Sequence, residues 1–169
     1  MKLTTKNIVR TISLILLLGL FCVIFGFSNQ NSENSSALSK RVTEAVLSHI
    51  SYVQNLDDES KQNIYDTAEK IVRKLAHLSI YTLVGIFAAI FTYTYTVPAK
   101  AQVVVSALIG AAYATLDELH QTLIPGRTGR LGDVALDTIG VLIGICLVFL
   151  VIAIYQHIKK SKKVTPVAN

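Results

Sequence analysis

Four long apolar stretches dominate the chain, and polar segments or turns separate them. The stretches cover residues 8–27, 75–96, 101–119 and 131–158. Because a helix rises about 1.5 Å per residue, roughly 20 residues cross a hydrocarbon core of roughly 30 Å. Lipid offers no water to the backbone, so each stretch must be helical. The pattern therefore predicts an all-α fold, a four-helix transmembrane bundle.

The first apolar stretch, 8–27, begins like a signal peptide, because Lys2 and Lys6 precede it and Arg10 lies at its start. It is longer than the apolar part of a signal peptide, and no A-x-A cleavage site follows it. We therefore predict an uncleaved first transmembrane helix.

The polar segment after this helix carries an additional amphipathic helical region. It opens with a Ser- and Asn-rich run, 28–36, which predicts a loop. Asp57, Asp58 and Glu59 predict the start of another helix, which continues into the second span. Between them, helical spacing predicts an amphipathic helix over 38–53, on the membrane surface or on the bundle, from the apolar residues Leu38, Val42, Val46, Leu47, Ile50 and Val53.

Composition agrees with a membrane protein. Hydrophobic residues make up 51% of the chain and charged residues 16%, and the mean hydropathy is +0.50. A soluble domain of this size could not bury so much apolar surface, and its charged fraction would be about 25%. The net charge of +5 could indicate nucleic acid, but the positions of the charges argue against that class of partner.

The charges predict how the chain is oriented. The N-terminus, the turn at 97–101 and the C-terminal tail together hold eight Lys and Arg residues and no Asp or Glu. Cytoplasmic segments carry an excess of Lys and Arg. We therefore expect a multi-pass protein of the cell membrane with both termini cytoplasmic. Segments 28–74 and 121–132 would then face outward.

Glycines predict where the helices pack closely. Gly140 and Gly144 lie four residues apart in the fourth span, a small-xxx-small pattern. Gly85 and Gly110 are expected to do the same in the second and third spans.

Ionisable residues gather at three helix ends that this topology places on the outer side. Charges beside lipid are costly, so each needs a reason. At the start of the second span, Arg73, His77 and Tyr81 follow one another at four-residue spacing. The third span ends with acidic residues, and the fourth span begins with acidic residues. The candidate site consists of Arg73, Lys74, His77, Tyr81, Asp117, Glu118, His120, Gln121, Arg127, Arg130, Asp133 and Asp137.

These residue types suit acid–base chemistry, metal binding and anion binding. His77, His120 and the four carboxylates of the site are candidate acids, bases or metal ligands. A divalent metal fits these donors, but no metal-binding motif supports it, and Cys22 and Cys146 lie far from any His. The glycines at 126–132 predict a tight turn whose N–H groups face an anion. The candidate anion ligands are Arg73, Lys74, Arg127 and Arg130, and Tyr81 and Gln121 would support the site.

Simpler interpretations stay open for several of these residues. His77 and Asp137 could be a buried polar pair that sets the register of two helices. One of Asp117 and Glu118 is expected in the pocket and the other in solvent. Arg127 and Arg130 could be solvated loop charges, but as a pair on either side of Gly129 they are expected to order the loop by ion pairing.

Taken together, these residues resemble the VanZ-like membrane protein family. The matching pieces are Arg73-Lys74 with Ala76-His77 and Tyr81, then Asp117-Glu118 with His120-Gln121, then Pro125-Gly126-Arg127, and last Asp133-Val134 with Asp137, Gly140 and Gly144. The resemblance implies a multi-pass cell-membrane protein, in a family named for a member associated with low-level resistance to the glycopeptide teicoplanin. The motifs that match the family lie within roughly 71–150. Together with the predicted spans, they divide the chain into a first transmembrane helix (8–27), an extracytoplasmic segment with amphipathic helices (28–70), a VanZ-like core with three spans (71–158) and a basic cytoplasmic tail (159–169).

Three functions fit the sequence. The first is an enzyme acting at the outer leaflet on a phosphate- or carboxylate-bearing lipid or cell-wall precursor. The second is a binding or resistance factor that holds a precursor headgroup or a glycopeptide without turnover. The third is a small transporter, which would need polar residues nearer the middle of the bilayer. Membrane lipids are the expected surroundings, and nucleic acid is not expected as a partner.

Overall fold

The computed structural model describes residues 4–30, 32–125, 127 and 129–164, and all regular structure in this part is α-helical. Four helices are long and apolar enough to cross a membrane. The predicted fold class is therefore confirmed. Lys2, Gly126 and residues 165–169 of the predicted tail lie outside the described residues. The helices are α1 (Thr5–Ser28), α2 (Ser32–Leu47), α3 (Ser51–Gln54), α4 (Asp58–Tyr93), α5 (Ala99–Gln121) and α6 (Leu131–Val164).

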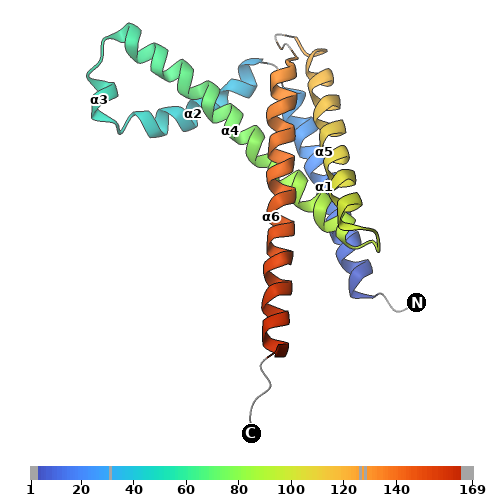
Figure 1. Cartoon of the computed structure of the whole chain (residues 1–169). Coiled ribbons are helices and arrows are strands. Elements are labelled where there is room, and N and C mark those ends of the chain that lie inside the picture. The colour runs from blue at the N-terminus through green and yellow to red at the C-terminus, as the bar shows by residue number, and fades with distance from the viewer. Residues whose placement is uncertain (1–3, 31, 126, 128, 165–169) are drawn as a thin grey trace.

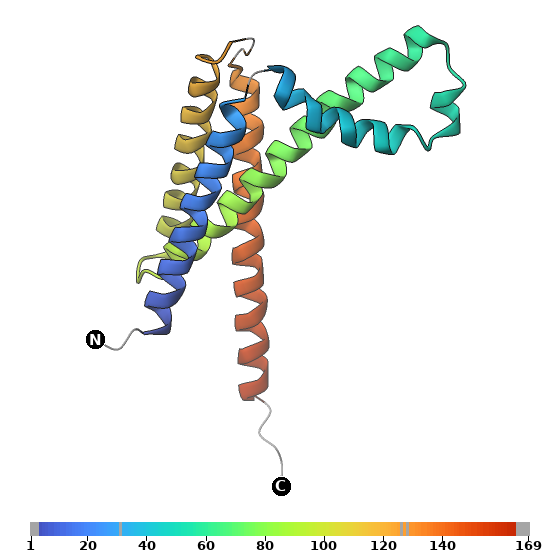
Figure 2. The same ribbon diagram turned by 180° about the vertical axis from the view of Figure 1, so that it is seen from behind.

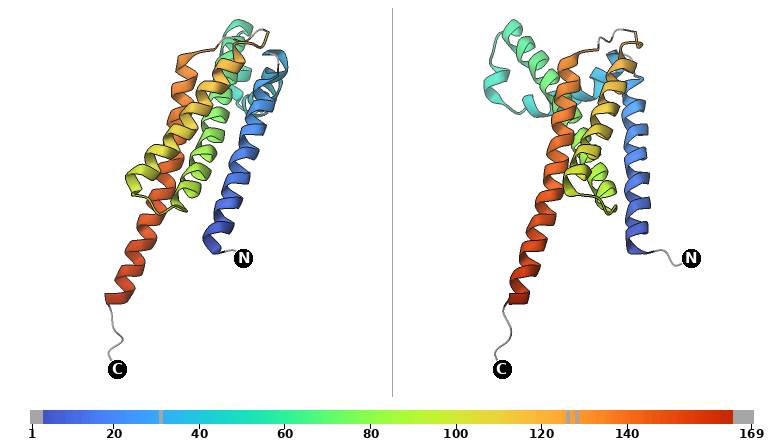
Figure 3. Two further views of the ribbon diagram at one scale, coloured as in Figure 1. Left: turned by 90° about the vertical axis from the view of Figure 1, so that its right-hand side faces the viewer. Right: turned by 45° about the vertical axis from the view of Figure 1, so that its right-hand side comes forward.

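Three of the spanning helices run side by side, and α4 crosses them obliquely (Figure 1; Figure 2). The first part of α4 leaves the bundle and forms, with α2 and α3, an arm on one side. The start of α1 and the end of α6 lie at the same end of the bundle, and the α5–α6 connection lies at the opposite end (Figure 3). The ends of α1 and α5 therefore meet the start of α6 where the sequence predicts the site.

Glycines hold α4 and α6 in close contact. A Cβ atom at Gly144 would lie 2.1 Å from the Thr82 carbonyl oxygen, and one at Gly85 would lie 2.1 Å from the Val141 carbonyl oxygen. A Cβ at Gly140 would also meet backbone, at 2.7 Å. Only residues without a side chain permit this approach. The glycine pattern was therefore interpreted correctly, and it brings the start of α6 against the middle of α4.

A narrow stripe attaches α1 to the other helices. Its buried residues are Ser13, Leu17, Ile24 and Ser28, whereas most of its other apolar residues are exposed. At one end, the Arg10 guanidinium donates to Thr94 Oγ1 at 3.0 Å and to the Thr94 carbonyl at 3.2 Å. At the other end, Ser28 enters the candidate site. The exposed majority of the helix surface suits a lipid environment.

The amphipathic region differs from the prediction in two ways. A loop was expected over 28–36, but α2 begins at Ser32, and the helix expected over 38–53 breaks after Leu47. The break has a local cause, because the His49 ring nitrogen Nδ1 lies 2.8 Å from the Ala45 carbonyl oxygen. The backbone N–H of His49 bonds to Val46 instead. A side chain that takes a helical acceptor competes with the helix.

Most apolar residues of α2 are exposed rather than packed on α4. Thr43 and Ser39 are buried, whereas Leu38 is 61% exposed and Val46 is 58% exposed. Leu47 and Val53, which belong to the same predicted face, are buried. The structure therefore divides the predicted apolar face, and α2 packs on α4 along Ser39, Thr43 and Leu47. The start of α4 agrees with the sequence, because the Asp57 carboxylate accepts the N–H of Ser60 at 2.9 Å.

Candidate functional site

A cavity of about 570 Å³ opens where the end of α5 and the start of α6 meet α4. Nine of its lining residues are ionisable: Lys70, Arg73, Lys74, His77, Glu118, Arg127, Arg130, Asp133 and Asp137. Gln121 also lines it. Most residues of the predicted constellation are therefore brought together, as the convergence of three helix ends requires.

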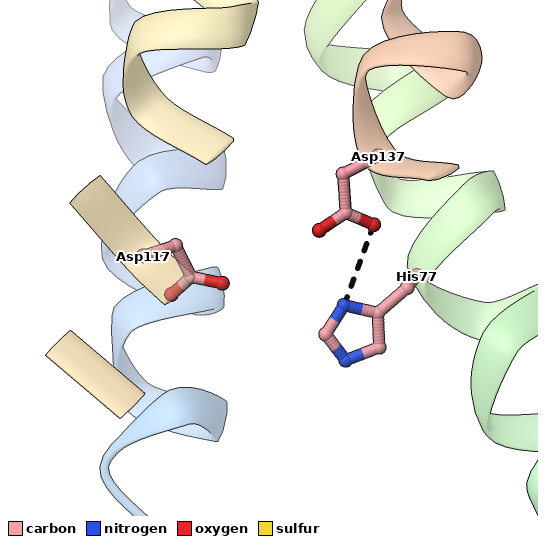
Figure 4. Close-up of side chains that lie close together, drawn as sticks. All are labelled: His77, Asp117 and Asp137. Atoms are coloured by element: carbon pink, nitrogen blue, oxygen red, sulfur yellow. Dashed lines mark ion pairs between the residues drawn. The ribbon is translucent and has the colours of Figure 1, made fainter. Parts of the chain in front are cut away.

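His77 of α4 and Asp137 of α6 face each other across the helix interface. The imidazole Nδ1 lies 3.6 Å from Asp137 Oδ1, within ion-pair distance but beyond a hydrogen bond (Figure 4). Asp137 is only 1% exposed, and within the described part of the chain neither of its carboxylate oxygens has a hydrogen-bond partner. Burial of a carboxylate with so little compensation costs several kcal/mol. The buried carboxylate of Asp137 therefore needs a further proton, hydrogen-bond donor or cation to compensate its charge.

Asp117 of α5 has the opposite situation, because three donors hold it. Ser28 Oγ donates to Oδ1 at 2.5 Å, and Tyr81 Oη and Gln121 Nε2 donate to Oδ2 at 3.2 and 3.0 Å. Asp117 is 5% exposed. The supporting roles predicted for Tyr81 and Gln121 match these contacts. The carboxylate is rigidly oriented toward the gap between α4 and α6 (Figure 4).

Glu118 holds the loop before α6. Its Oε1 accepts the backbone N–H of Arg130 at 2.6 Å. A Cβ at Gly129 would lie 2.4 Å from Thr122, so a glycine lets the loop approach the end of α5. The sequence expected one of Asp117 and Glu118 to be solvated, and this was wrong because both are buried. The turn at 126–132 was expected to direct its N–H groups at an anion. The N–H of Arg130 instead bonds to the Glu118 carboxylate of the chain itself.

The basic side chains are arranged around the cavity rather than buried in it. Arg73 pairs with Glu69 at 3.0 Å, and Lys74 lies 3.9 Å from Asp133. Arg127 donates to the carbonyl of Phe27 at 3.3 Å.

Arg127 is also crowded by another cation. Burial, together with the positive charge of Arg73, lowers the pKa of the Arg127 guanidinium from its usual value. Arg127 and Arg130 were expected to order the loop by ion pairing. Among the described residues neither forms a salt bridge, and the loop is held through the backbone of Arg130 instead. An anion entering the cavity would relieve the repulsion between Arg127 and Arg73.

His120 is not part of this arrangement. Its ring stacks on Phe25 of α1, with centroids 4.7 Å apart, and it does not line the cavity. Gln121 lies one helical turn after Asp117 and bonds to it, so His120, one residue earlier, lies on another face of α5 and meets α1. The predicted role of His120 in acid–base chemistry or metal binding therefore has no geometric support.

Two residues of the site escaped the sequence interpretation. Ser28 is the last residue of α1 and hydrogen-bonds Asp117. The sequence signal for it was its position four residues after Ile24, on the face of α1 that is buried. Lys70 lines the cavity, and its signal was the spacing of three residues to Arg73 on the same helix.

One set of donors could hold a metal ion. One ligand atom each from His77, Asp117 and Asp137 lies within 4.8 Å of the other two. These residues come from α4, α5 and α6 and point toward a common space (Figure 4).

Comparison with known proteins gives one family. A family model described as VanZ/LLP1 matches residues 13–153, which include every residue of the candidate site. No curated protein and no solved structure matches the chain. The match agrees with the resemblance found in the sequence motifs.

Proposed function

Because the chain belongs to the VanZ/LLP1 family and has four helices fit to span a membrane, we propose that it binds the anionic headgroup of a membrane lipid or lipid-linked cell-wall precursor. The protein lies in the cell membrane with both termini cytoplasmic, and the cavity opens outward. The distribution of Lys and Arg supports this orientation.

The single observation that carries the proposal is the charge of the cavity. Five basic side chains line it, against three carboxylates, of which Glu118 is already bonded to the loop. Arg binds phosphate or carboxylate through two parallel N–H bonds. An excess of cations that is incompletely paired by the chain itself selects an anion.

The surroundings of the cavity favour a lipid as the carrier of that anion. Ile71 lines the cavity and is 52% exposed, and Leu75, one turn further along α4, is exposed as well. Apolar side chains beside a polar cavity match a molecule that has a charged head and apolar tails. The ligand's tails would lie along α4 while the headgroup meets Arg73 and Arg127.

Two carboxylates of the site are committed to the structure, and this favours binding without turnover over catalysis, which is the second candidate function. Asp117 and Glu118 accept hydrogen bonds that hold α1, α4 and the loop. His77, beside Asp137, is the remaining group placed for proton transfer. Binding a wall precursor would shield it, and catalysis would alter it. Either outcome would connect the cavity to glycopeptide resistance.

Binding to vesicles tests the proposal. The purified protein in nanodiscs should bind lipid whose headgroup is net anionic in preference to zwitterionic lipid, and Arg127→Gln should weaken this binding at least about fivefold. The matched control is Arg41→Gln, which removes an exposed Arg of α2 outside the cavity. Equal loss in both variants, or equal binding of both lipids, would refute the cavity as the anion site.

Product analysis separates the two candidates. Radiolabelled lipid-linked wall precursor is incubated with the protein, and the products are separated by chromatography. A new product that disappears in His77→Gln identifies an enzyme. Binding with no chemical change identifies a binding factor.

A further inference from the structure

We propose that His77, Asp117 and Asp137 bind a single divalent transition-metal ion, such as Zn²⁺ or Mn²⁺, where α4, α5 and α6 meet at the inner end of the cavity. The proposal does not depend on which anion the cavity binds. It follows from the positions and burial of three side chains.

The separations suit a metal ion better than direct contact. Two ligands with metal bonds of about 2.1 Å in tetrahedral geometry lie about 3.4 Å apart. His77 Nδ1 and Asp137 Oδ1 are 3.6 Å apart, too far for a hydrogen bond. The ligand atoms of all three residues lie within 4.8 Å of one another. Side-chain adjustments of about 1 Å would complete the triad.

An unsatisfied buried carboxylate is the independent sign of a ligand. Asp137 is 1% exposed, lies in the wall of the cavity and points toward Asp117 (Figure 4). Neither of its oxygens has a hydrogen-bond partner in the described residues. A simple register pair with His77 would bring the nitrogen and oxygen into hydrogen-bond contact. A cation between them satisfies both groups instead.

Electrostatics supports the same conclusion. Two carboxylates, on Asp117 and Asp137, are buried within a few ångströms of each other. A divalent ion balances their combined charge in a low-dielectric setting, where uncompensated charges are costly.

The hydrogen bonds that hold Asp117 are of the kind found around metal ligands. Ligating carboxylates are usually oriented by outer hydrogen bonds. Asp117 has three such bonds, from Ser28, Tyr81 and Gln121, which come from three different helices. The ion would therefore join all four spanning helices, with α1 entering through Ser28.

The donor set indicates the class of metal. Imidazole nitrogen favours Zn²⁺ and other transition metals, and carboxylate oxygens accept Zn²⁺ and Mn²⁺. Three protein ligands leave at least one position open, as in sites that bind water or a substrate. That position faces the cavity, because His77 and Asp137 line it.

Direct metal binding tests the proposal. The full chain in detergent is stripped with chelator and titrated with Zn²⁺, and with Mn²⁺ followed by electron paramagnetic resonance. We expect one equivalent bound, with a rise in Tm on saturation. Asp137→Asn and His77→Gln should each weaken affinity about 10- to 100-fold.

Asp133→Asn is the matched control, because it removes a carboxylate of the same cavity wall outside the triad. Its affinity should stay within about threefold of the unaltered chain. Equal weakening by Asp133→Asn would indicate diffuse charge attraction and overturn the site. Absence of stoichiometric binding to the unaltered chain would overturn it without any variant.

A spectroscopic readout avoids dependence on how the variants fold. Co²⁺ bound to the unaltered chain should give visible d–d bands that Zn²⁺ abolishes, and their absence would contradict an inner-sphere site. Arg127→Gln should leave these bands unchanged. In the unaltered chain, absence of anion binding with the bands present would refute the proposed function alone, and anion binding with the bands absent would refute the metal site alone.

Discussion

Replacing Gly144 by Ala should separate α4 from α6. A Cβ at this position would lie 2.1 Å from the Thr82 carbonyl oxygen and 2.7 Å from the backbone nitrogen of Ile86. Ordinary contact begins at 3.4 Å, so the new atom would be about 1.3 Å too close. Both opposing atoms are backbone, and no side-chain rotation relieves the clash. The helices themselves must move.

The magnitude follows from overpacking. Inserting a methyl group into a tightly packed interface destabilises a protein by about 1–3 kcal/mol. Alanine is intrinsically more favourable than glycine within a helix, by about 1 kcal/mol. The matched control is Gly19→Ala on α1, where a Cβ meets nothing within 4 Å. Both variants share the helix term, so their difference isolates the clash and should be about 1–3 kcal/mol.

Unfolding in mixed micelles with a rising fraction of denaturing detergent measures this difference by circular dichroism. The Gly144→Ala variant should also weaken Zn²⁺ binding, because separating α4 from α6 lengthens the 3.6 Å gap between His77 and Asp137. If Gly144→Ala unfolds at the same detergent fraction as Gly19→Ala, the close approach of the two helices is refuted.

Three further predictions concern the first helix and the arm. Arg10→Lys loses the double contact with Thr94 and should lower stability by about 1 kcal/mol, measured by the same unfolding assay; unchanged stability would contradict the clamp. The chain has no Trp, so Val42→Trp places one fluorophore on the exposed apolar face of α2, where brominated lipid should quench it more than Glu44→Trp; equal quenching would show that this face does not meet lipid. The hydrogen bond from the backbone N–H of Ser60 lowers the pKa of Asp57. The stabilisation that Asp57 gives to the start of α4 is therefore present above the unfolded pKa and is lost as pH falls through the lower folded pKa. Hydrogen exchange at the first turn of α4, corrected for intrinsic rates, should rise over that pH range in the unaltered chain and be pH-independent in Asp57→Ala.

The helices of this protein follow from local information. The apolar stretches set the four spans, and Asp57 marks the start of α4 through its hydrogen bond to Ser60. The alternating direction of consecutive spans brings the start of the second span, the end of the third and the start of the fourth to one side of the membrane, so His77, Asp117 and Asp137 could be expected to meet. The glycine spacing indicated which helices pack closely.

Only the tertiary structure decided how each helix is rotated about its own axis. Residues three or four apart in sequence share a face of a helix, but their spacing does not say which neighbouring helix that face meets. Thus His120 faces Phe25 while Gln121 reaches Asp117, and α2 leaves Leu38 and Val46 exposed while it buries Leu47. Ser28 joins the site because the buried stripe of α1 ends there. The close α4–α6 packing sets the distance between His77 and Asp137, on which the metal proposal depends.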